Sequence, residues 1–344
     1  MQKQNLTRAH QELYRRQEDE RFETLLALRD HCRNRKRQSV DLWCPPRDLK
    51  PCAIDSDQFQ LGVGADGAFL MNDWSFGQLC KLAGVGKETV NRLTAATASQ
   101  VFAETLPRGN KPLQMFIEEN RVRSIHGTSY TRLFDADLVQ MLEDFAVDFQ
   151  PPQTAVGGGT GLYAGEQDLF CFLIDPTGWT EIEGEAFAPG FFVWNSEVGR
   201  RSIGIQTFWF QAVCQNHIVW DAVEVVEFSR KHTSSVGDAL TDVRRIIDGL
   251  VAKRDERRDA FAKVIGKAMS ERLGSDAEEA LKTLLKNGIP RSAAKEALKI
   301  AEQQGRFTIF ALVDALTRMA GKVQFAGERY ELDARAATLL ALAV

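Results

Sequence analysis

A short polar run, Asn195-Ser196-Glu197, contains residue types that serve in acid–base and nucleophilic catalysis. A glutamate can act as a general base or a metal ligand, and a serine as a nucleophile when a histidine is within hydrogen-bond reach. His217 would supply that histidine if its strand lies beside the run. No Gly-x-Ser-x-Gly elbow surrounds Ser196. In turns, Asn and Ser commonly bond the backbone and Glu pairs with arginine, so a structural interpretation stays open.

Basic and aromatic residues gather around this run. Single-stranded nucleic acid is bound by cations that follow the phosphates and by aromatic rings on which bases stack. The residues that we expect to contact nucleic acid are Arg200, Arg201, Arg230, Lys231, His232, Arg123, Arg132, Tyr130, Trp209 and Trp220. The basic residues of 200–201 and 230–232 would contact phosphate, and Trp209 or Trp220 would stack bases. The alternative is that the aromatic residues belong to the core and the arginines hold loops together.

Cysteine and histidine spacing does not predict a bound metal. Cys214-Gln-Asn-His217 is the one metal-like spacing, and no second pair follows to complete a zinc site. We therefore predict no metal and no cofactor, with magnesium left open because carboxylates are abundant. The six cysteines follow no tight spacing and are expected to be reduced. The glycine run at 157–161 lacks the Lys-Ser/Thr of a nucleotide-binding loop.

The composition is that of an ordinary folded protein. Of 344 residues, 44% are hydrophobic and 26% charged, and the net charge of −4 excludes a protein that coats nucleic acid by bulk charge alone. Residues 133–199 contain twelve acidic residues and no Lys or Arg, which predicts a solvated acidic face, a divalent-metal site or a docking surface. The sequence shows neither a signal peptide nor a membrane span, so we expect a cytoplasmic protein without membrane contact.

The pattern of apolar residues predicts an α+β fold. One charged helix is expected over 4–37 and a short helix over 113–119. The expected central, mostly antiparallel sheet comes from strands within 59–71, 121–128, 168–174 and 187–219. Helices within 74–145 would flank this sheet. The expected domains are a helical arm at 1–45, an α+β core at 46–235 and a helical C-terminal region at 236–344.

Several sequence blocks resemble a family of phage- and plasmid-like proteins of mobile elements, the domain of unknown function numbered 932. The most specific block is Asn195-Ser-Glu-Val-Gly199 within residues 190–199. The other blocks are Trp74-Ser-Phe76, Val122–Tyr130 with Asp135, Cys214–Val219, Arg230-Lys-His232 and Phe307–Thr317 with Phe310 and Asp314. The resemblance covers roughly residues 60–340. His217 departs from the glycine that is usual in this family, which questions a tight turn there.

The resemblance implies a mobile-element setting beside replication, recombination or defence genes. By fold-level analogy, it also suggests a protein similar to single-strand-annealing recombination proteins. We therefore expect a non-enzymatic, homo-oligomeric protein that binds single-stranded DNA. One alternative is an enzyme acting on nucleic acid or nucleotides through Glu197, Ser196 and His217. Another is a non-catalytic oligomer that binds a protein partner through its amphipathic helices.

Overall fold

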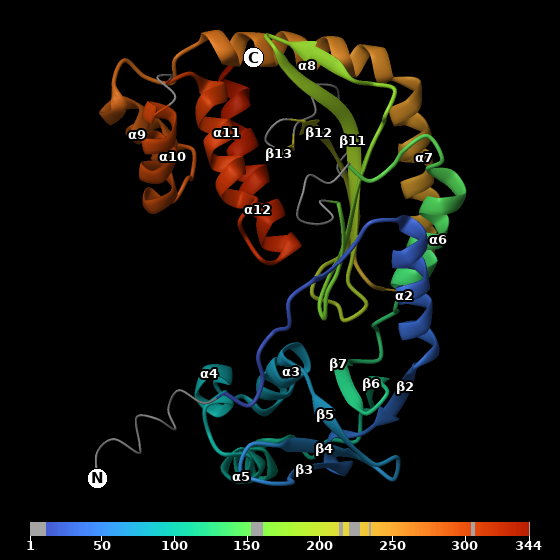
Figure 1. The fold of residues 1–344 in the computed structure, drawn as a ribbon. Coiled ribbons are helices and arrows are strands. Elements are labelled where there is room, and N and C mark those ends of the chain that lie inside the picture. Colours follow the sequence, from blue (N-terminus) through green and yellow to red (C-terminus); the bar gives the residue numbers. More distant parts are fainter. Residues whose placement is uncertain are drawn as a thin grey trace.

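The computed structural model describes residues 12–152, 161–212, 216–219, 228–233, 235–303 and 307–343. Two β-sheets dominate the architecture, one below the other in Figure 1. Helices flank both sheets, so the predicted α+β class is confirmed. Within the described residues, no helix is long and apolar enough to cross a membrane.

The lower sheet is formed near the N-terminus. Its spatial order is β2-β6-β7-β5-β4-β3, and every pair is antiparallel except β5–β7. The strands are β2 (Ser39–Cys44), β3 (Leu49–Ala53), β4 (Phe59–Val63), β5 (Ala68–Met71), β6 (Leu113–Glu118) and β7 (Arg121–His126). The helices α3 (Asp73–Ala83), α4 (Lys87–Asn91) and α5 (Ala95–Thr105) pack beside it. Phe59, Phe76 and Phe102 contact one another at the centre of this core, which orients α3 and α5 on the sheet.

The upper sheet carries the long hairpin of β11 (Glu185–Asn195) and β12 (Ile203–Gln211). Its main path is β1-β8-β9-β11-β12-β13, with β10 on β11 and β14 on β12. The remaining strands are β1 (Glu20–Phe22), β8 (Leu162–Ala164), β9 (Leu169–Ile174), β10 (Thr180–Ile182), β13 (Asn216–Ile218) and β14 (Phe228–Arg230).

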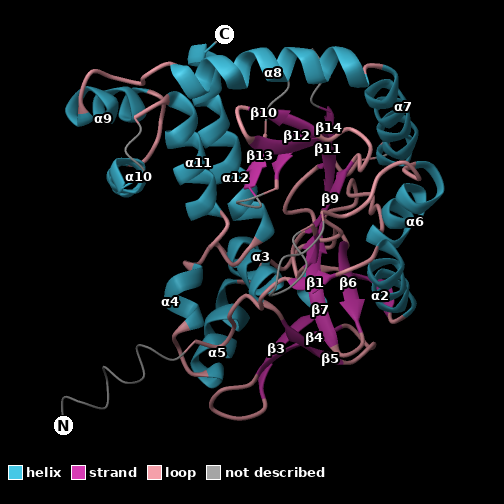
Figure 2. Ribbon diagram, turned by 45° about the horizontal axis from the view of Figure 1, so that its top comes forward, coloured by secondary structure: helices cyan, strands magenta, loops and turns pink. Residues whose placement is uncertain are grey.

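Both faces of the upper sheet are covered by helices (Figure 2). One face packs on α2 (Leu25–Arg37), α6 (Asp135–Phe145) and α7 (Ala239–Ala252), and the other packs on α12 (Ala326–Ala337). Cys171 and Leu173 of β9 point to the first face, whereas Phe170 and Phe172 point to the second. Because both faces of the sheet are shielded from water, β9 is apolar along its whole length instead of alternating between apolar and polar residues.

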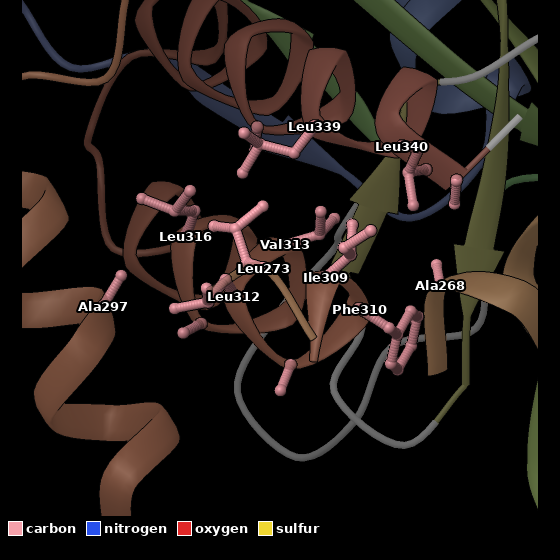
Figure 3. Packing of buried hydrophobic residues seen from close by; sticks show 14 of the residues in the cluster. Ala268, Leu273, Ala297, Ile309, Phe310, Leu312, Val313, Leu316, Leu339 and Leu340 are labelled. Atoms are coloured by element: carbon pink, nitrogen blue, oxygen red, sulfur yellow. The ribbon is translucent and has the colours of Figure 1, made fainter. Parts of the chain in front are cut away.

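The C-terminal region is helical, as predicted. After α7 it contains α8 (Arg254–Ser270), α9 (Ala277–Lys286), α10 (Arg291–Gln303), α11 (Ile309–Ala320), α12 and the short helix Thr338–Ala343. Figure 3 shows how Leu312, Leu316 and Leu339 pack at the centre of this cluster. Phe187 and Trp209 of the upper sheet join the same core, so this region packs directly on the sheet.

The structure differs from the predicted elements in three places. Of the helix expected over 4–37, residues 4–11 lie outside the described residues, and residues 12–24 are not helical. The described helix begins at Leu25, where the Thr24 side chain accepts a hydrogen bond from the Ala27 amide. The segment 113–119 forms β6 instead of a helix, because it pairs on both sides with β2 and β7. The strands expected to build one sheet separate into two. The strands within 59–71 and 121–128 belong to the lower sheet, and the described strands within 168–174 and 187–219 belong to the upper one.

Candidate functional site

The turn that joins β11 to β12, residues 195–202, lies where the two sheets meet. Glu197 in this turn is buried and both of its carboxylate oxygens are used. Its Oε2 accepts a hydrogen bond from Arg123 Nη1 of β7 at 2.8 Å, and its Oε1 accepts one from the Asp135 backbone amide at 2.9 Å. The Glu197 carbonyl accepts hydrogen bonds from the Tyr130 hydroxyl at 2.9 Å and from Arg132. The turn therefore connects the upper sheet to β7, to the segment that follows it, and to the start of α6.

A second buried carboxyl, Asp135, lies beside the ion pair at this junction. Burial raises the pKa of Asp135 to about 8, and the nearby charge of Glu197 adds to that rise. Burial opposes the ionisation of Glu197 as well, but Arg123 and Arg35 outweigh it and lower its pKa. Asn195 fixes this arrangement because its amide donates to Asp135 Oδ1 at 2.8 Å and to the Leu133 carbonyl at 2.9 Å.

Ser196 and His217, the other residues of the hypothetical catalytic set, lie apart from each other. Ser196 is buried, and its hydroxyl donates to the Gln167 carbonyl at 2.6 Å and accepts from the Arg200 amide at 3.0 Å. His217 lies opposite Phe210 near the far end of β12, about 20 Å along the strand from the turn. There it is buried and stacked on Phe172, with ring centroids 4.2 Å apart. The structure does not bring the serine and the histidine together, and the polar run has the structural role that its residue types allow.

The predicted nucleic-acid residues fall into several environments, and Arg123 and Arg132 are buried in ion pairs. Arg123 Nε lies 3.0 Å from Glu118 Oε2, in addition to its bond with Glu197. Arg132 Nη2 lies 2.7 Å from Asp41 Oδ1, and its guanidinium covers the Phe116 ring. Neither guanidinium is available to a phosphate in this arrangement.

Arg200 and Arg201 are half-buried around a single carboxylate. The Asp168 Oδ2 atom lies 3.5 Å from Arg200 Nε and 3.4 Å from Arg201 Nε. Arg201 also reaches Glu331 on α12, at 2.7 Å. Burial raises the pKa of Asp168, and the arginines beside it oppose that rise. These arginines anchor the turn to β9 and α12, and they retain partial exposure on one side.

The predicted aromatic residues are also placed differently from one another. Trp209 is 1% exposed and stacks on Phe261 at a centroid distance of 4.0 Å, so its faces are not open to a base. Trp220 lies outside the described residues, and nothing is described of the Arg230 side chain. Lys231 is exposed. His232 is buried against Tyr130.

A stack of three aromatic rings packs against the turn. His126 stacks on Tyr130 with centroids 3.6 Å apart and an interplanar angle of 6°, and His232 lies on Tyr130 at 5.4 Å. Burial lowers the pKa of both histidines to about 4, so both are neutral at pH 7. Gly199, with a positive φ of 73°, packs so tightly on the stack that a Cβ there would lie 2.6 Å from His126 Cε1.

Blocks that are far apart in the sequence thus meet at this turn. Trp74 of α3 donates its indole hydrogen to the Val198 carbonyl at 2.8 Å. The segment Val122–Tyr130, Asp135 and His232 reach the same place through the contacts given above. The block Phe307–Thr317 does not, since it lies in the C-terminal helical core. Cys214 lies outside the described residues.

A groove of about 840 Å³ opens beside the turn, between α3 and the end of β7. Trp74, Leu82, Leu113 and Ile125 form its apolar part, and His126 and Gly199 connect it to the ring stack. The other residues that line it are Gly77, Gln78, Lys81, Lys87 and Gly127. Among the described residues the lining contains two lysines and no carboxylate, and Asp73, just outside the lining, neutralises one of the lysines.

The two lysines of the groove differ in their partners. Lys87 Nζ lies 2.8 Å from Asp73 Oδ1. Lys81 is exposed, and no described carboxylate oxygen lies within 4.0 Å of its Nζ. Sequence reasoning missed both residues. The available signal was the turn Gly84-Val-Gly86, which reverses the chain and brings the end of α3 near the start of α4.

A smaller hollow of about 330 Å³ lies between β1, α2 and the β6–β7 turn. Arginines and glutamates line it together, and Arg35 is paired there with Glu118 at 3.0 Å. Over the described ranges, no group of three or more His, Cys, Asp or Glu residues is arranged to hold a metal ion. The groove beside the turn is therefore the better candidate for a ligand site.

The fold and the junction define an α+β protein in which one turn fastens two sheets together beside a basic, partly apolar groove. The family model of the domain of unknown function DUF932 matches residues 124–338, more than half of the chain, and the chain belongs to this family. The match includes the 195–202 turn, the ring stack and most of the C-terminal helices. Trp74 and the lysines of the groove precede it. Neither the curated proteins nor the solved structures yielded a significant match.

Proposed function

We propose that this protein binds single-stranded DNA in the groove beside the 195–202 turn, as a non-enzymatic recombination or annealing factor of a phage or plasmid, in the cytoplasm of the host. The observation that carries the proposal is the lining of the groove, which combines an indole, aliphatic side chains and two lysines, of which Lys87 is paired with Asp73 and Lys81 has no described carboxylate partner. Bases would stack on Trp74 and phosphates would approach Lys81. The resemblance to mobile-element proteins is the reason for choosing DNA.

The electrostatics favour a single strand entering a groove over a duplex lying on a surface. The chain has a net charge of −4, and residues 133–199 carry twelve acidic residues and no cation. A duplex with its dense phosphates needs a broad basic face. One strand with exposed bases gains stacking, worth about 1–3 kcal/mol per base, in addition to its phosphate contacts. An indole next to a lysine that has no carboxylate partner among the described residues suits the single strand better.

The described contacts of the hypothetical catalytic residues do not favour the enzymatic alternative. Glu197 and Ser196 are buried and fully hydrogen-bonded, and His217 lies at the other end of β12. Their contacts account for the residue types without any chemistry.

The test is a fluorescence-anisotropy titration with a labelled thymidine oligonucleotide and its duplex, at low and moderate salt. We expect salt-sensitive binding of the single strand, which Lys81→Glu weakens strongly. The matched control is Lys263→Glu, which reverses an exposed lysine on α8, at the opposite end of the molecule (Figure 1). The control should bind like the wild type. Absence of binding at low salt, or equal losses in both variants, would refute the proposal.

A further inference from the structure

An ion pair lies at the edge of the groove beside the 195–202 turn. Asp73 Oδ1 lies 2.8 Å from Lys87 Nζ, and of these two residues only the lysine belongs to the lining. Lys87 follows the turn that ends α3, and its side chain reaches back along that helix to Asp73, the first residue of α3. The side chains of Lys87 and Asp73 are 35% and 19% exposed, so a ligand in the groove can reach the pair.

Gly77 of α3 makes room for this lysine. A Cβ at residue 77 would lie 3.3 Å from Lys87 Cδ and 3.5 Å from Lys87 Nζ. The lysine side chain therefore covers the backbone of α3 at this position. Gly77 also lines the groove, which places the Lys87 ammonium at the wall of the groove while it remains bonded to Asp73.

Asp73 has a second partner that lies outside the groove. Its Oδ2 accepts a hydrogen bond from Gln167 Nε2 at 3.3 Å. Gln167 is buried, and its own Oε1 accepts a hydrogen bond from Arg200. The Gln167 carbonyl accepts another from the Ser196 hydroxyl at 2.6 Å. The loop between β8 and β9 therefore holds the Asp73 carboxylate independently of Lys87.

We propose that Asp73 is an internal counter-ion that a DNA phosphate displaces from Lys87, so that a bound strand gains a second phosphate contact in the groove. This inference rests on the proposed function, because the phosphate belongs to a strand in the groove. A partly exposed ion pair contributes little to stability, so the exchange of one anion for another is inexpensive. Asp73 keeps its bond to Gln167 after the exchange, and Lys87 gains a charge-assisted hydrogen bond to the phosphate.

The counter-ion makes the groove selective for a strand over a small anion. Any phosphate that binds Lys87 must displace Asp73 and then lie near its negative charge, which repels it. A strand offsets this cost by stacking on Trp74 and by contacting Lys81, whereas inorganic phosphate occupies one position only. Asp73 therefore lowers the affinity for phosphates in general and leaves only the multiply bound strand with useful affinity.

Fluorescence anisotropy with the labelled thymidine oligonucleotide tests the exchange. Asp73→Asn removes the charge but keeps the shape and an oxygen for the Gln167 amide. Its affinity should rise about two- to fivefold at low salt, the range that corresponds to one partly exposed ion pair. The slope of log affinity against log salt should steepen by up to about one, because the displaced wild-type carboxylate takes up a salt cation. The matched control is Asp66→Asn, an exposed change in the β4–β5 turn with the same effect on net charge, and it should bind like the wild type.

The same substitution in a Lys87→Gln background separates the exchange from simple repulsion. Without the lysine there is no ion pair to break, so Asp73→Asn should raise the affinity less in this background than in the protein that keeps Lys87. Urea denaturation of each variant checks that it is folded under the binding conditions. Equal increases in the two backgrounds, or no increase when Lys87 is present, would overturn the inference.

The proposed function fails by a different result. If the wild type does not bind the oligonucleotide, or if Lys81→Glu binds it as tightly as the wild type, the strand does not occupy the groove and both proposals fall. If Lys81→Glu weakens binding but Asp73→Asn does not strengthen it, the groove remains the binding site and only the role of Asp73 is refuted.

Discussion

The Glu197 carboxylate and the Arg123 guanidinium form a buried ion pair across the junction of the two sheets, with 2.8 Å between Oε2 and Nη1. Both side chains are almost fully inaccessible to solvent, 3% and 4% exposed. A buried pair contributes modestly as a pair, but removing one partner is costly, because it leaves a buried charge less well compensated. Without Glu197, Arg123 would keep only Glu118, whose Oε2 lies 3.0 Å from its Nε. We therefore expect the architecture to depend on Glu197.

The first prediction concerns Glu197→Gln, which keeps the size and one acceptor oxygen but removes the charge. We expect the free energy of unfolding to fall by about 3 kcal/mol, measured by urea denaturation, because Arg123 loses a buried counter-charge. Glu331→Gln removes the more exposed partner of Arg201 and should cost less than about 1 kcal/mol. Equal stability of Glu197→Gln and the wild type would mean that the ion pair does not hold the junction. A catalytic Glu197 would instead lose turnover while stability stays unchanged.

The second prediction compares two glycines that share a positive φ but differ in their surroundings. Gly199 has φ 73° and a would-be Cβ 2.6 Å from His126 Cε1, whereas Gly84 has φ 68° and open space. Gly84→Ala should cost only the backbone strain, about 1–2 kcal/mol. Gly199→Ala should cost that strain plus about 1–3 kcal/mol for overpacking the ring stack. Thermal or urea unfolding of both variants measures the loss of unfolding free energy. Equal losses in the two variants would show that the ring stack accommodates a Cβ at residue 199 without a cost in stability.

Sequence patterns predicted the parts of this protein that local chemistry determines. The apolar run at Leu169–Ile174 could only be a buried strand or a short buried helix, and the hairpin within 59–71 is marked by the turn at Ala65-Asp-Gly67. The capped, amphipathic segments after residue 236 were sufficient to predict a helical region. In these segments propensity, pattern and packing agree.

The predictions that were wrong or missing concern features that depend on contacts between distant segments. Leu113–Glu118 is a strand because β2 and β7 flank it, and no local signal shows those neighbours. The sequence around Trp209 does not show whether its ring is free to stack on a base. In the structure the ring stacks on Phe261, because α8 packs against this part of the sheet. The groove combines α3, α4, β6, β7 and the 195–202 turn, so Lys81 becomes a candidate only after the chain is folded.

The third prediction uses salt dependence to separate the groove from the two arginines of the turn. Each phosphate contact that is lost reduces the slope of log affinity against log salt by about one. Lys81→Ala should reduce the slope for single-stranded DNA by that amount, because its ammonium has no described carboxylate partner. Lys263→Ala, on α8, should leave affinity and slope unchanged.

The double variant Arg200→Ala with Arg201→Ala provides the complementary result. Both guanidinium groups lie near Asp168, so we expect a loss of stability and a slope change of about two at most. Stability is therefore measured first, and binding at a temperature where the double variant is folded. A slope change of about two in the double variant with none in Lys81→Ala would place the binding site on the turn instead of the groove.

The last prediction concerns pH. The pKa of Asp135 rises from an ordinary 3.8 to about 8 on folding, mainly through burial. Between these two values the folded protein binds a proton that the unfolded chain releases, so this residue stabilises the fold fully below about pH 4 and loses its contribution as the pH rises toward 8. The slope of this loss is at most about 1.4 kcal/mol per pH unit.

The variant Asp135→Asn removes the ionisation but keeps an oxygen that can accept from the Asn195 amide. Its free energy of unfolding should fall less steeply from pH 5 to pH 8 than that of the wild type. Asp333, whose pKa is also raised to about 8, has the same sign in both proteins and cancels in the comparison. Asp144→Asn, an exposed change on the same helix, should keep the wild-type slope. Parallel curves for Asp135→Asn and the wild type would show that Asp135 is already ionised in the folded protein at neutral pH.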